Sequence, residues 1–209
     1  MIKEALHAKL QKAFKGIHLE DGIGYFEADA LDDYLAKDSK EYLEYKIKDI
    51  RSDWEIAAES FKDWKGANTE AYCFMDIKGL LYHLPIFMCN EIFYDLLDYL
   101  IVEIGEHSQI KEDPATSRQP YYIGLLDLLS KEQLDCLIYF YRIRLDEKIE
   151  KAKTPFTCQT CGKVHIPWVK WNGVSAKNYV ANGFSDVYRV HQFLMRYMNT
   201  KTDKNQHAT

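Results

Sequence analysis

The feature that most constrains the fold of this chain is a strongly apolar segment between residues 86 and 104. Its spacing predicts a central helix that is mostly buried. The large apolar side chains of this segment are Ile86, Phe87, Met88, Ile92, Phe93, Leu96, Leu97, Leu100 and Ile101. The chain has 209 residues, 47% of them hydrophobic, which is enough to form one large domain, or one domain with a small appendage.

A change of pattern just before this segment predicts two short strands. Residues 71–75 form an apolar run, residues 76–79 read Asp-Ile-Lys-Gly, and residues 80–84 are again mostly apolar. This pattern is typical of a β-hairpin, in which Gly79 is free to adopt a positive φ. Pro85 then closes the second strand and can begin the next helix. We therefore predict an α+β fold that is predominantly helical, with a small central hairpin.

Apolar periodicity predicts further helices along the chain. They cover residues 2–15, 25–36, 58–64, 130–150 and 185–198. Ser130 and Gln133 fit a capping box at the start of the 130–150 helix, and residues 105–120 are expected to form an exposed loop. We expect a main domain at 1–150, a C-terminal extension at 151–200 packed on it, and a disordered tail at 201–209.

The charges of the chain are distributed unevenly. Residues 19–60 hold 13 acidic against 5 basic side chains, and residues 76–150 hold 14 against 7, so their net charges are −8 and −7. Residues 151–209 hold 9 basic against 2 acidic side chains, a net charge of +7. This pattern indicates either an ordinary solvated surface with a basic tail packed against it, or an acidic face that attracts a basic partner by long-range steering.

Six charged residues of the first acidic stretch are our candidates for binding a protein partner. They are Glu27, Asp29, Asp32, Asp33, Arg51 and Asp53. Carboxylates that converge with an arginine can instead perform acid–base chemistry, here beside His83, or form a buried ion-pair network. A lone histidine in a predicted strand is more often structural than catalytic.

The segment Cys158-Gln-Thr-Cys161-Gly162-Lys163 has the shape of a zinc knuckle, in which one tight turn presents two thiolates. His165 is a candidate third ligand, and His191 on the last predicted helix is a candidate fourth. One structural zinc would stabilise an extension that has few apolar anchors. The alternatives are an eroded knuckle that binds nothing and a redox dithiol. A stable structural disulfide between the two cysteines is disfavoured in a reducing cytosol.

Several functional motifs are absent from the sequence. No His-Glu-x-x-His precedes the cysteine pair, which argues against a zinc protease, and no glycine-rich phosphate loop occurs. The overall acidity argues against nucleic-acid binding by the basic tail. The N-terminus lacks the apolar core of a signal peptide, and no run approaches about 18 apolar residues, so we expect a cytoplasmic protein without a membrane span.

Residues 14–140 resemble a bacterial domain family of unknown function. The motifs that carry the resemblance are Phe14-x-Gly16-Ile17-x-Leu19-x-Asp21-Gly22-Ile23 with Glu27-Ala28 and Asp32-Asp33-Tyr34, Arg51-x-Asp53-Trp54-x-Ile56, Phe74-x-Asp76-x-x-Gly79-x-x-Tyr82-x-Leu84-Pro85-x-Phe87-Met88, and Leu128-Leu129-Ser130-x-Glu132-Gln133. The resemblance implies an α+β domain with a helical bulk and implies no reaction. It does not extend to residues 158–209.

We therefore predict a non-enzymatic, protein-binding module of the immunity or antitoxin type. Such a protein would neutralise a basic toxin by covering its active surface, and an acidic face would speed the association. Two alternatives stay open. One is an enzyme of unknown reaction that uses the Asp/Arg cluster, and the other is a zinc-stabilised regulatory or nucleic-acid adaptor.

Overall fold

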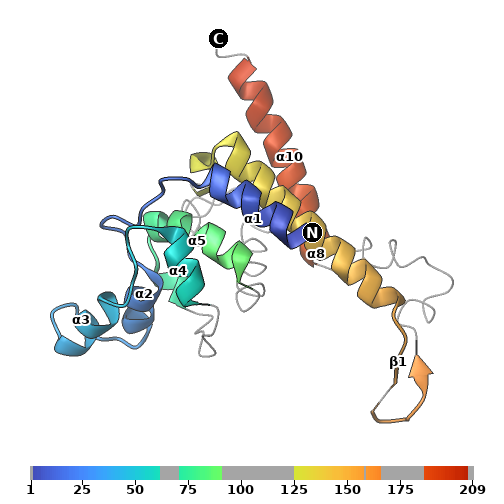
Figure 1. Ribbon diagram of the computed structural model, residues 1–209, viewed down its shortest axis with the longest axis horizontal. Coiled ribbons are helices and arrows are strands. Elements are labelled where there is room, and N and C mark those ends of the chain that lie inside the picture. The colour runs from blue at the N-terminus through green and yellow to red at the C-terminus, as the bar shows by residue number, and fades with distance from the viewer. Residues whose placement is uncertain (1, 62–70, 91–124, 158, 166–185, 207–209) are drawn as a thin grey trace, which may run out of the picture. The chain divides into compact units, whose positions relative to one another are not determined.

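The computed structural model describes residues 2–61, 71–90, 125–157, 159–165 and 186–206, and this part of the chain is mostly helical (Figure 1). Two compact units make up the chain, residues 1–136 and 137–209. The sequence predicted the division near residue 150. Among the described helices, none combines the length and the apolar character that a membrane crossing requires.

The first unit is built from short helices. In chain order they are α1 (Ile2–Ala13), α2 (Tyr25–Asp32), α3 (Lys40–Lys46), α4 (Trp54–Ser60), the 3₁₀ helix η1 (Ala71–Phe74) and α5 (Ile77–Cys89). Helix α2 packs against α3 and η1, and α4 packs against α5 (Figure 1). The largest fully buried side chains of these elements and their connections are Leu10, Phe14, Leu19, Tyr25, Leu80, Tyr82, Leu84, Ile86 and Phe87.

The predicted hairpin at 71–84 is wrong, because these residues form η1 and most of α5. Asp76, interpreted as a turn residue, is the N-cap of α5, and its Oδ1 accepts the Gly79 N–H at 2.7 Å. Aspartate makes the same short-range bond in turns and at helix starts, so the local pattern did not separate the two structures. Pro85 lies inside α5 rather than before it. The predicted α+β class is therefore replaced by a mostly helical fold.

Gly79 is required by a close approach of two backbones rather than by a positive φ. A Cβ atom at Gly79 would lie 1.9 Å from the carbonyl oxygen of Ile23. Asp76 secures this approach, because its Oδ1 also accepts the Ile23 N–H at 3.0 Å. The first turn of α5 is thus joined to the link between α1 and α2. The remainder of the apolar segment, residues 91–104, lies outside the described residues.

Helix α8 (Lys131–Lys153) begins with the predicted capping box and crosses the division between the units. Ser130 N–H donates to Gln133 Oε1 at 2.9 Å, and Gln133 N–H donates to Ser130 Oγ at 3.2 Å. The Gln133 amide also donates to the Ala13 carbonyl at 3.1 Å, which joins the start of α8 to the end of α1. The predicted helix start is therefore confirmed.

The second unit contains most of α8, two short strands and α10 (Asp186–Gln206). Strands β1 (Phe156–Thr157) and β2 (Val164–His165) pair antiparallel, with Phe156 opposite His165. No other strand occurs among the described residues. Both strands lie far along the chain from the hairpin that the sequence predicted. Helix α10 continues through residues 201–206, where the sequence predicted a disordered tail.

Candidate functional site

Glu27, the first of the predicted partner-binding residues, lies inside the molecule with only 3% of its surface exposed. Its Oε1 accepts hydrogen bonds from Tyr42 Oη and, at 2.7 Å, from Lys46 Nζ, while Oε2 accepts from Arg51 Nη2 at 2.8 Å. Burial alone would raise the pKa of this carboxyl, but the bonds from Lys46, Tyr42 and Arg51 hold it below the ordinary value. Glu27 is thus a neutralised structural anion that joins α2 to α3.

A second buried carboxylate, Asp49, caps the start of α2. Its two oxygens accept the N–H groups of Phe26 and Glu27, both at 3.0 Å. Gly24 is the N-cap residue and has no side chain for this role, and a Cβ there would lie 2.3 Å from the Asp49 Cγ. Burial raises the pKa of Asp49 to about 6, against the opposing effect of the two backbone N–H groups.

Arg51 fixes the link between α1 and α2. Its Nη1 donates to the carbonyl oxygens of Glu20 at 2.8 Å and Gly22 at 2.9 Å, in addition to the bond from Nη2 to Glu27. The Arg51 carbonyl accepts the Leu19 N–H at 2.9 Å. The guanidinium therefore holds three parts of the fold together, and both of its terminal nitrogens donate to structural bonds.

The remaining predicted residues separate into two places. Asp53 is the N-cap of α4, where its side chain accepts the N–H groups of Glu55 and Ile56. Asp29 and Asp32 are half-buried on α2, and Asp33 is an exposed residue at the C-cap of α2. The structure thus brings Glu27 and Arg51 together, and leaves Asp33 as the most accessible member of the set.

His83, the residue considered beside this cluster, is buried in α5. Its Nδ1 lies 2.9 Å from the Gly79 carbonyl oxygen, and burial lowers its pKa to about 4. The ring packs between aromatic neighbours, with Tyr82 at 5.1 Å and Phe87 at 5.8 Å between ring centroids. These surroundings are those of a neutral core histidine.

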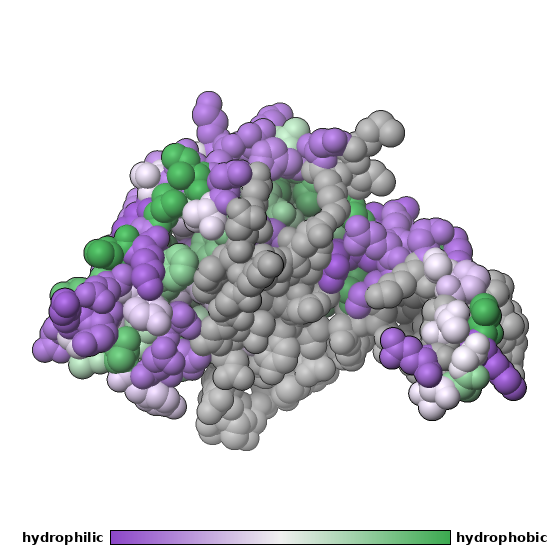
Figure 2. Space-filling model, turned by 60° about the horizontal axis from the view of Figure 1, so that its bottom comes forward, coloured by the Kyte–Doolittle hydropathy of each residue, from purple (hydrophilic) through white to green (hydrophobic). Residues whose placement is uncertain are grey.

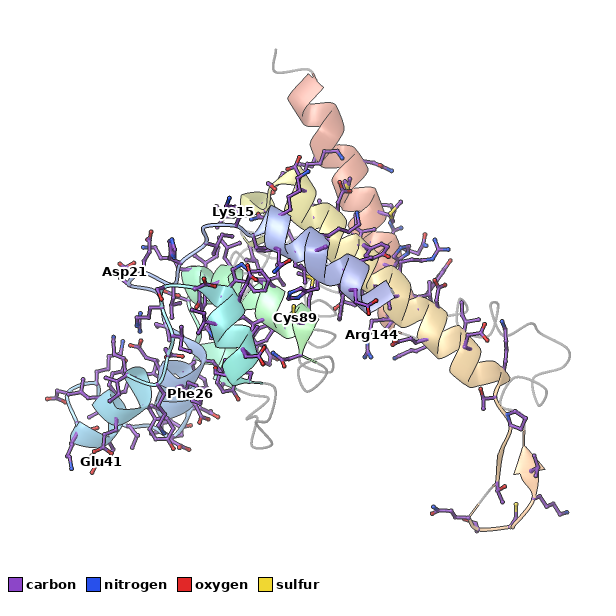
Figure 3. The ribbon with its side chains drawn as sticks, viewed as in Figure 1. Lys15, Asp21, Phe26, Glu41, Cys89 and Arg144 are labelled. Atoms are coloured by element: carbon purple, nitrogen blue, oxygen red, sulfur yellow. The ribbon has the colours of Figure 1, made fainter. Side chains whose placement is uncertain are left out.

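Large apolar side chains project into solvent at the end of α2 and along α3. Tyr34 is 92% exposed, Ile47 80% and Leu43 48%. Figure 2 shows green apolar side chains bordered by purple hydrophilic ones on the left of the view, and Figure 3 places Glu41 on α3 in the same region. We call residues 25–48 the α2–α3 lobe. Sequence reasoning singled out the acids of this lobe and missed its exposed apolar residues.

Tyr34 also has an unusual backbone conformation, with φ at +57°. It follows the C-cap residue Asp33, and the N–H groups of Tyr34 and Leu35 bond back to the carbonyls of Leu31 and Ala30. This is the Schellman arrangement, in which the left-handed position is most often glycine. A tyrosine there is uncommon, and no local sequence rule predicts it.

A cavity of about 530 Å³ lies between α1, α4 and α5. At its wall lies Cys89 of α5 (Figure 3). Its Sγ is 3.6 Å from Nδ1 of His7 on α1. Cys89 belongs to the 86–104 segment that the sequence predicted to be mostly buried, but the residue is partly exposed. The two residues are 82 positions apart, so no local pattern could have paired them.

The predicted zinc ligands are only partly described. Cys161 is exposed in the segment between β1 and β2, Cys158 lies outside the described residues, and His165 is the last residue of β2. His191 is buried on α10, and its Nδ1 has no hydrogen-bond partner among the described residues. Within the described part of the chain, no three His, Cys, Asp or Glu side chains converge as a metal site. Because Cys158 lies outside that part, the zinc ligand set stays a prediction.

No family model, curated protein or solved structure matches the chain. The functional proposal therefore rests on the geometry described above. The resemblance to a bacterial domain family therefore stays a prediction.

Proposed function

We propose that this chain is a non-enzymatic binding module that recognises a basic protein partner through the α2–α3 lobe, as an immunity or antitoxin protein would bind its toxin. The observation that carries the proposal is Tyr34, a residue that is 92% exposed and has φ at +57°. Exposed tyrosines are frequent among the residues that contribute most to protein–protein binding.

The backbone conformation of Tyr34 makes a tyrosine at this position unfavourable for folding. A residue with a side chain costs about 1–2 kcal/mol in the left-handed region, whereas glycine adopts it readily. The exposed ring recovers little of that cost by burial, since only 8% of the residue is covered at an exposure of 92%. Folding alone would therefore favour glycine at this position. A role for the ring in binding explains the tyrosine.

The neighbouring side chains extend the surface. Ile47 and Leu43 add apolar area that a partner could cover. The lobe as a whole contains seven acidic side chains and four lysines, a net charge of −3, and Asp33, Asp38 and Glu41 are exposed. An apolar centre with acidic surroundings suits a basic partner, because charge steers the encounter and apolar burial holds the complex.

The internal ion pairs prepare this surface for binding. Glu27 of α2 is bonded to Tyr42 and Lys46 of α3, so the two helices that display the exposed residues are joined from within. A surface that is already rigid loses less conformational freedom on association. Glu27 and Arg51 thus support the proposed interface rather than contact the partner.

The substitution Tyr34→Gly separates binding from folding. The partner is first captured from the native cell and purified, and its affinity is then measured by surface plasmon resonance. We expect Tyr34→Gly to raise the Kd at least about 30-fold, as for an interface residue worth about 2 kcal/mol. The same change should raise the melting temperature, because glycine relieves the backbone strain. The on-rate of the unaltered protein should fall with added salt.

Ile56→Ser provides the matched control, because Ile56 is 57% exposed on α4, outside the lobe. It should leave the Kd unchanged. Equal Kd values for Tyr34→Gly and the unaltered protein would contradict the proposed surface. An on-rate indifferent to salt would remove the electrostatic part of the proposal.

A further inference from the structure

We propose that Cys89 and His7 form a thiol-addition site for small, uncharged α,β-unsaturated carbonyl compounds, which would bind in the cavity between α1, α4 and α5. This inference does not depend on the α2–α3 lobe. It rests on a nucleophile, an adjacent base and a space of ligand size, which lie together in one unit of the chain.

The first observation is the contact between the two side chains. Cys89 Sγ and His7 Nδ1 are 3.6 Å apart, within the range of a sulfur hydrogen bond. An imidazole at this distance can accept the thiol proton, and the imidazolium that forms stabilises the thiolate. Because Cys89 is partly exposed and His7 is exposed, a compound from solvent can reach both groups.

Trp54 helps to position the base. Its ring meets the His7 ring edge-on, with the centroids 6.4 Å apart, and its indole N–H donates to the Phe14 carbonyl at 3.0 Å. Trp54 is buried, so the imidazole lies against a fixed aromatic surface. This arrangement limits the orientations of His7 beside the thiol.

The cavity defines the class of compound. Its volume of about 530 Å³ lies within the range of small-molecule sites. Leu6, Leu10 and Met88 give it an apolar lining, which suits a hydrocarbon body. Glu4, Glu55 and Glu59 also line it and would repel an anionic compound. An uncharged compound with a small apolar body fits both properties.

The proposed step is an addition in which nothing leaves. The Cys89 sulfur forms a bond to the β-carbon of the unsaturated carbonyl compound, and the carbon–carbon double bond becomes single. The thiol proton moves to His7 Nδ1 and from there to the α-carbon. Atoms and electrons balance without an oxidant, a reductant or a second substrate.

The other described cysteines provide internal comparisons for a rate measurement. Cys73 and Cys161 are exposed, so access alone would make them react faster than Cys89. Cys136 is buried, and burial raises its pKa to about 11, so it should react slowest. Preferential reaction at Cys89 would therefore report activation rather than exposure.

The full-length protein is treated with limiting N-ethylmaleimide at several pH values, and each cysteine peptide is quantified by mass spectrometry. We expect Cys89 to react about tenfold faster than Cys73 and Cys161 at pH 7, because His7 lies within reach of its thiol proton. His7→Gln should lower the Cys89 rate about tenfold and leave the rates of Cys73 and Cys161 unchanged. The anionic probe 3-maleimidopropionic acid should show less preference for Cys89.

Two controls separate the site from general effects. His18→Gln alters an exposed histidine that is absent from the cavity lining, and it should not change the Cys89 rate. Ala8→Leu places a larger side chain at the cavity wall and should slow the addition at Cys89 alone. The proposal is overturned if Cys89 reacts no faster than Cys73 and Cys161, or if folded His7→Gln retains the full rate.

Discussion

The α2–α3 lobe and helix α8 both contain ion pairs, but they use them differently. In the lobe, Glu27 bonds to Lys46 and Arg51, which lie 19 and 24 positions away, and its carboxylate is almost fully buried. In α8, Arg142 and Asp146 are four positions apart on one exposed helix face. An ion pair that is buried between segments thus fixes tertiary structure, whereas an exposed pair along one helix makes only a local contact.

Helix length explains why the lobe depends on its buried charges. Helices α2 and α3 have 8 and 7 residues, and isolated helices of that length are unstable in water. Helix α8 has 23 residues and begins with a capping box, so much of its organisation is local. The lobe must obtain its order from contacts between segments, and those of Glu27, Asp49 and Arg51 are of this kind.

The largest expected effect is at Glu27. Glu27→Ala removes the acceptor of three side-chain donors from two other segments, and we expect it to lower the free energy of unfolding by about 3–5 kcal/mol. Urea denaturation followed by circular dichroism measures this change. Glu44→Ala is the matched control in the same lobe, since Glu44 makes only an exposed pair with Lys40 among the contacts described, and it should cost at most about 0.5 kcal/mol. Equal losses for the two variants would contradict the assigned importance of burial.

The same distinction separates what the sequence could predict from what it could not. The capping box of α8 was predictable, because Ser130 and Gln133 are three residues apart and their hydrogen bonds are local. Residues 76–79 were predicted to form a turn, because the local bond pattern of Asp76 fits a turn and a helix start equally. Gly79 and Pro85 obscure the helical periodicity of residues 77–89, because both residue types are common in turns.

The candidate sites depended on longer-range relations. Glu27 and Arg51 were selected together as charged residues, yet their burial and mutual bond could not be inferred from composition. The contact of His7 with Cys89 joins α1 to α5, and it arises only when both helices pack beside α4. Tyr34 was identifiable only from its backbone φ and its exposure. Sequence patterns thus located helix ends, whereas packing determined which side chains meet.

A smaller effect is expected from Asp49, the buried carboxylate that caps the first helix of the lobe, and it depends on pH. The pKa of Asp49 is about 6 in the folded protein, above its ordinary value of 3.8, because the side chain is buried. Between these values the folded state binds the proton more tightly than the unfolded chain, so stability from this group falls as pH rises. The loss between pH 4 and pH 7 is about 2.4 kcal/mol from this group alone. Glu27, whose pKa is lowered, contributes in the opposite direction at acid pH.

Asp49→Asn isolates this contribution. An amide does not titrate, so the stability of Asp49→Asn relative to the unaltered protein should rise by about 2–3 kcal/mol from pH 4 to pH 7. Urea denaturation at each pH measures the difference. Asp38→Asn, at an exposed position of the α2–α3 lobe, should follow the pH dependence of the unaltered protein. A constant difference between Asp49→Asn and the unaltered protein would show that Asp49 does not titrate in this window.

The smallest expected effect belongs to the Arg142–Asp146 pair of α8, and it tests the other half of the comparison. The two side chains are 63% and 59% exposed, with Arg142 Nε 3.2 Å from Asp146 Oδ2. The basic residue precedes the acidic one, which is the weaker orientation on a helix. A double-mutant cycle with Arg142→Ala and Asp146→Ala should therefore give a coupling energy of about 0.3 kcal/mol that declines with added salt. A coupling energy above about 1 kcal/mol would mean that an exposed, local pair can match a buried one, contrary to the contrast between these two regions.

The charges of Arg142 and Asp146 also act on His191, whose pKa is lowered by burial first and then by Arg142, while Asp146 raises it. Arg142→Ala should consequently raise the pKa of His191 and Asp146→Ala should lower it, as measured by NMR titration.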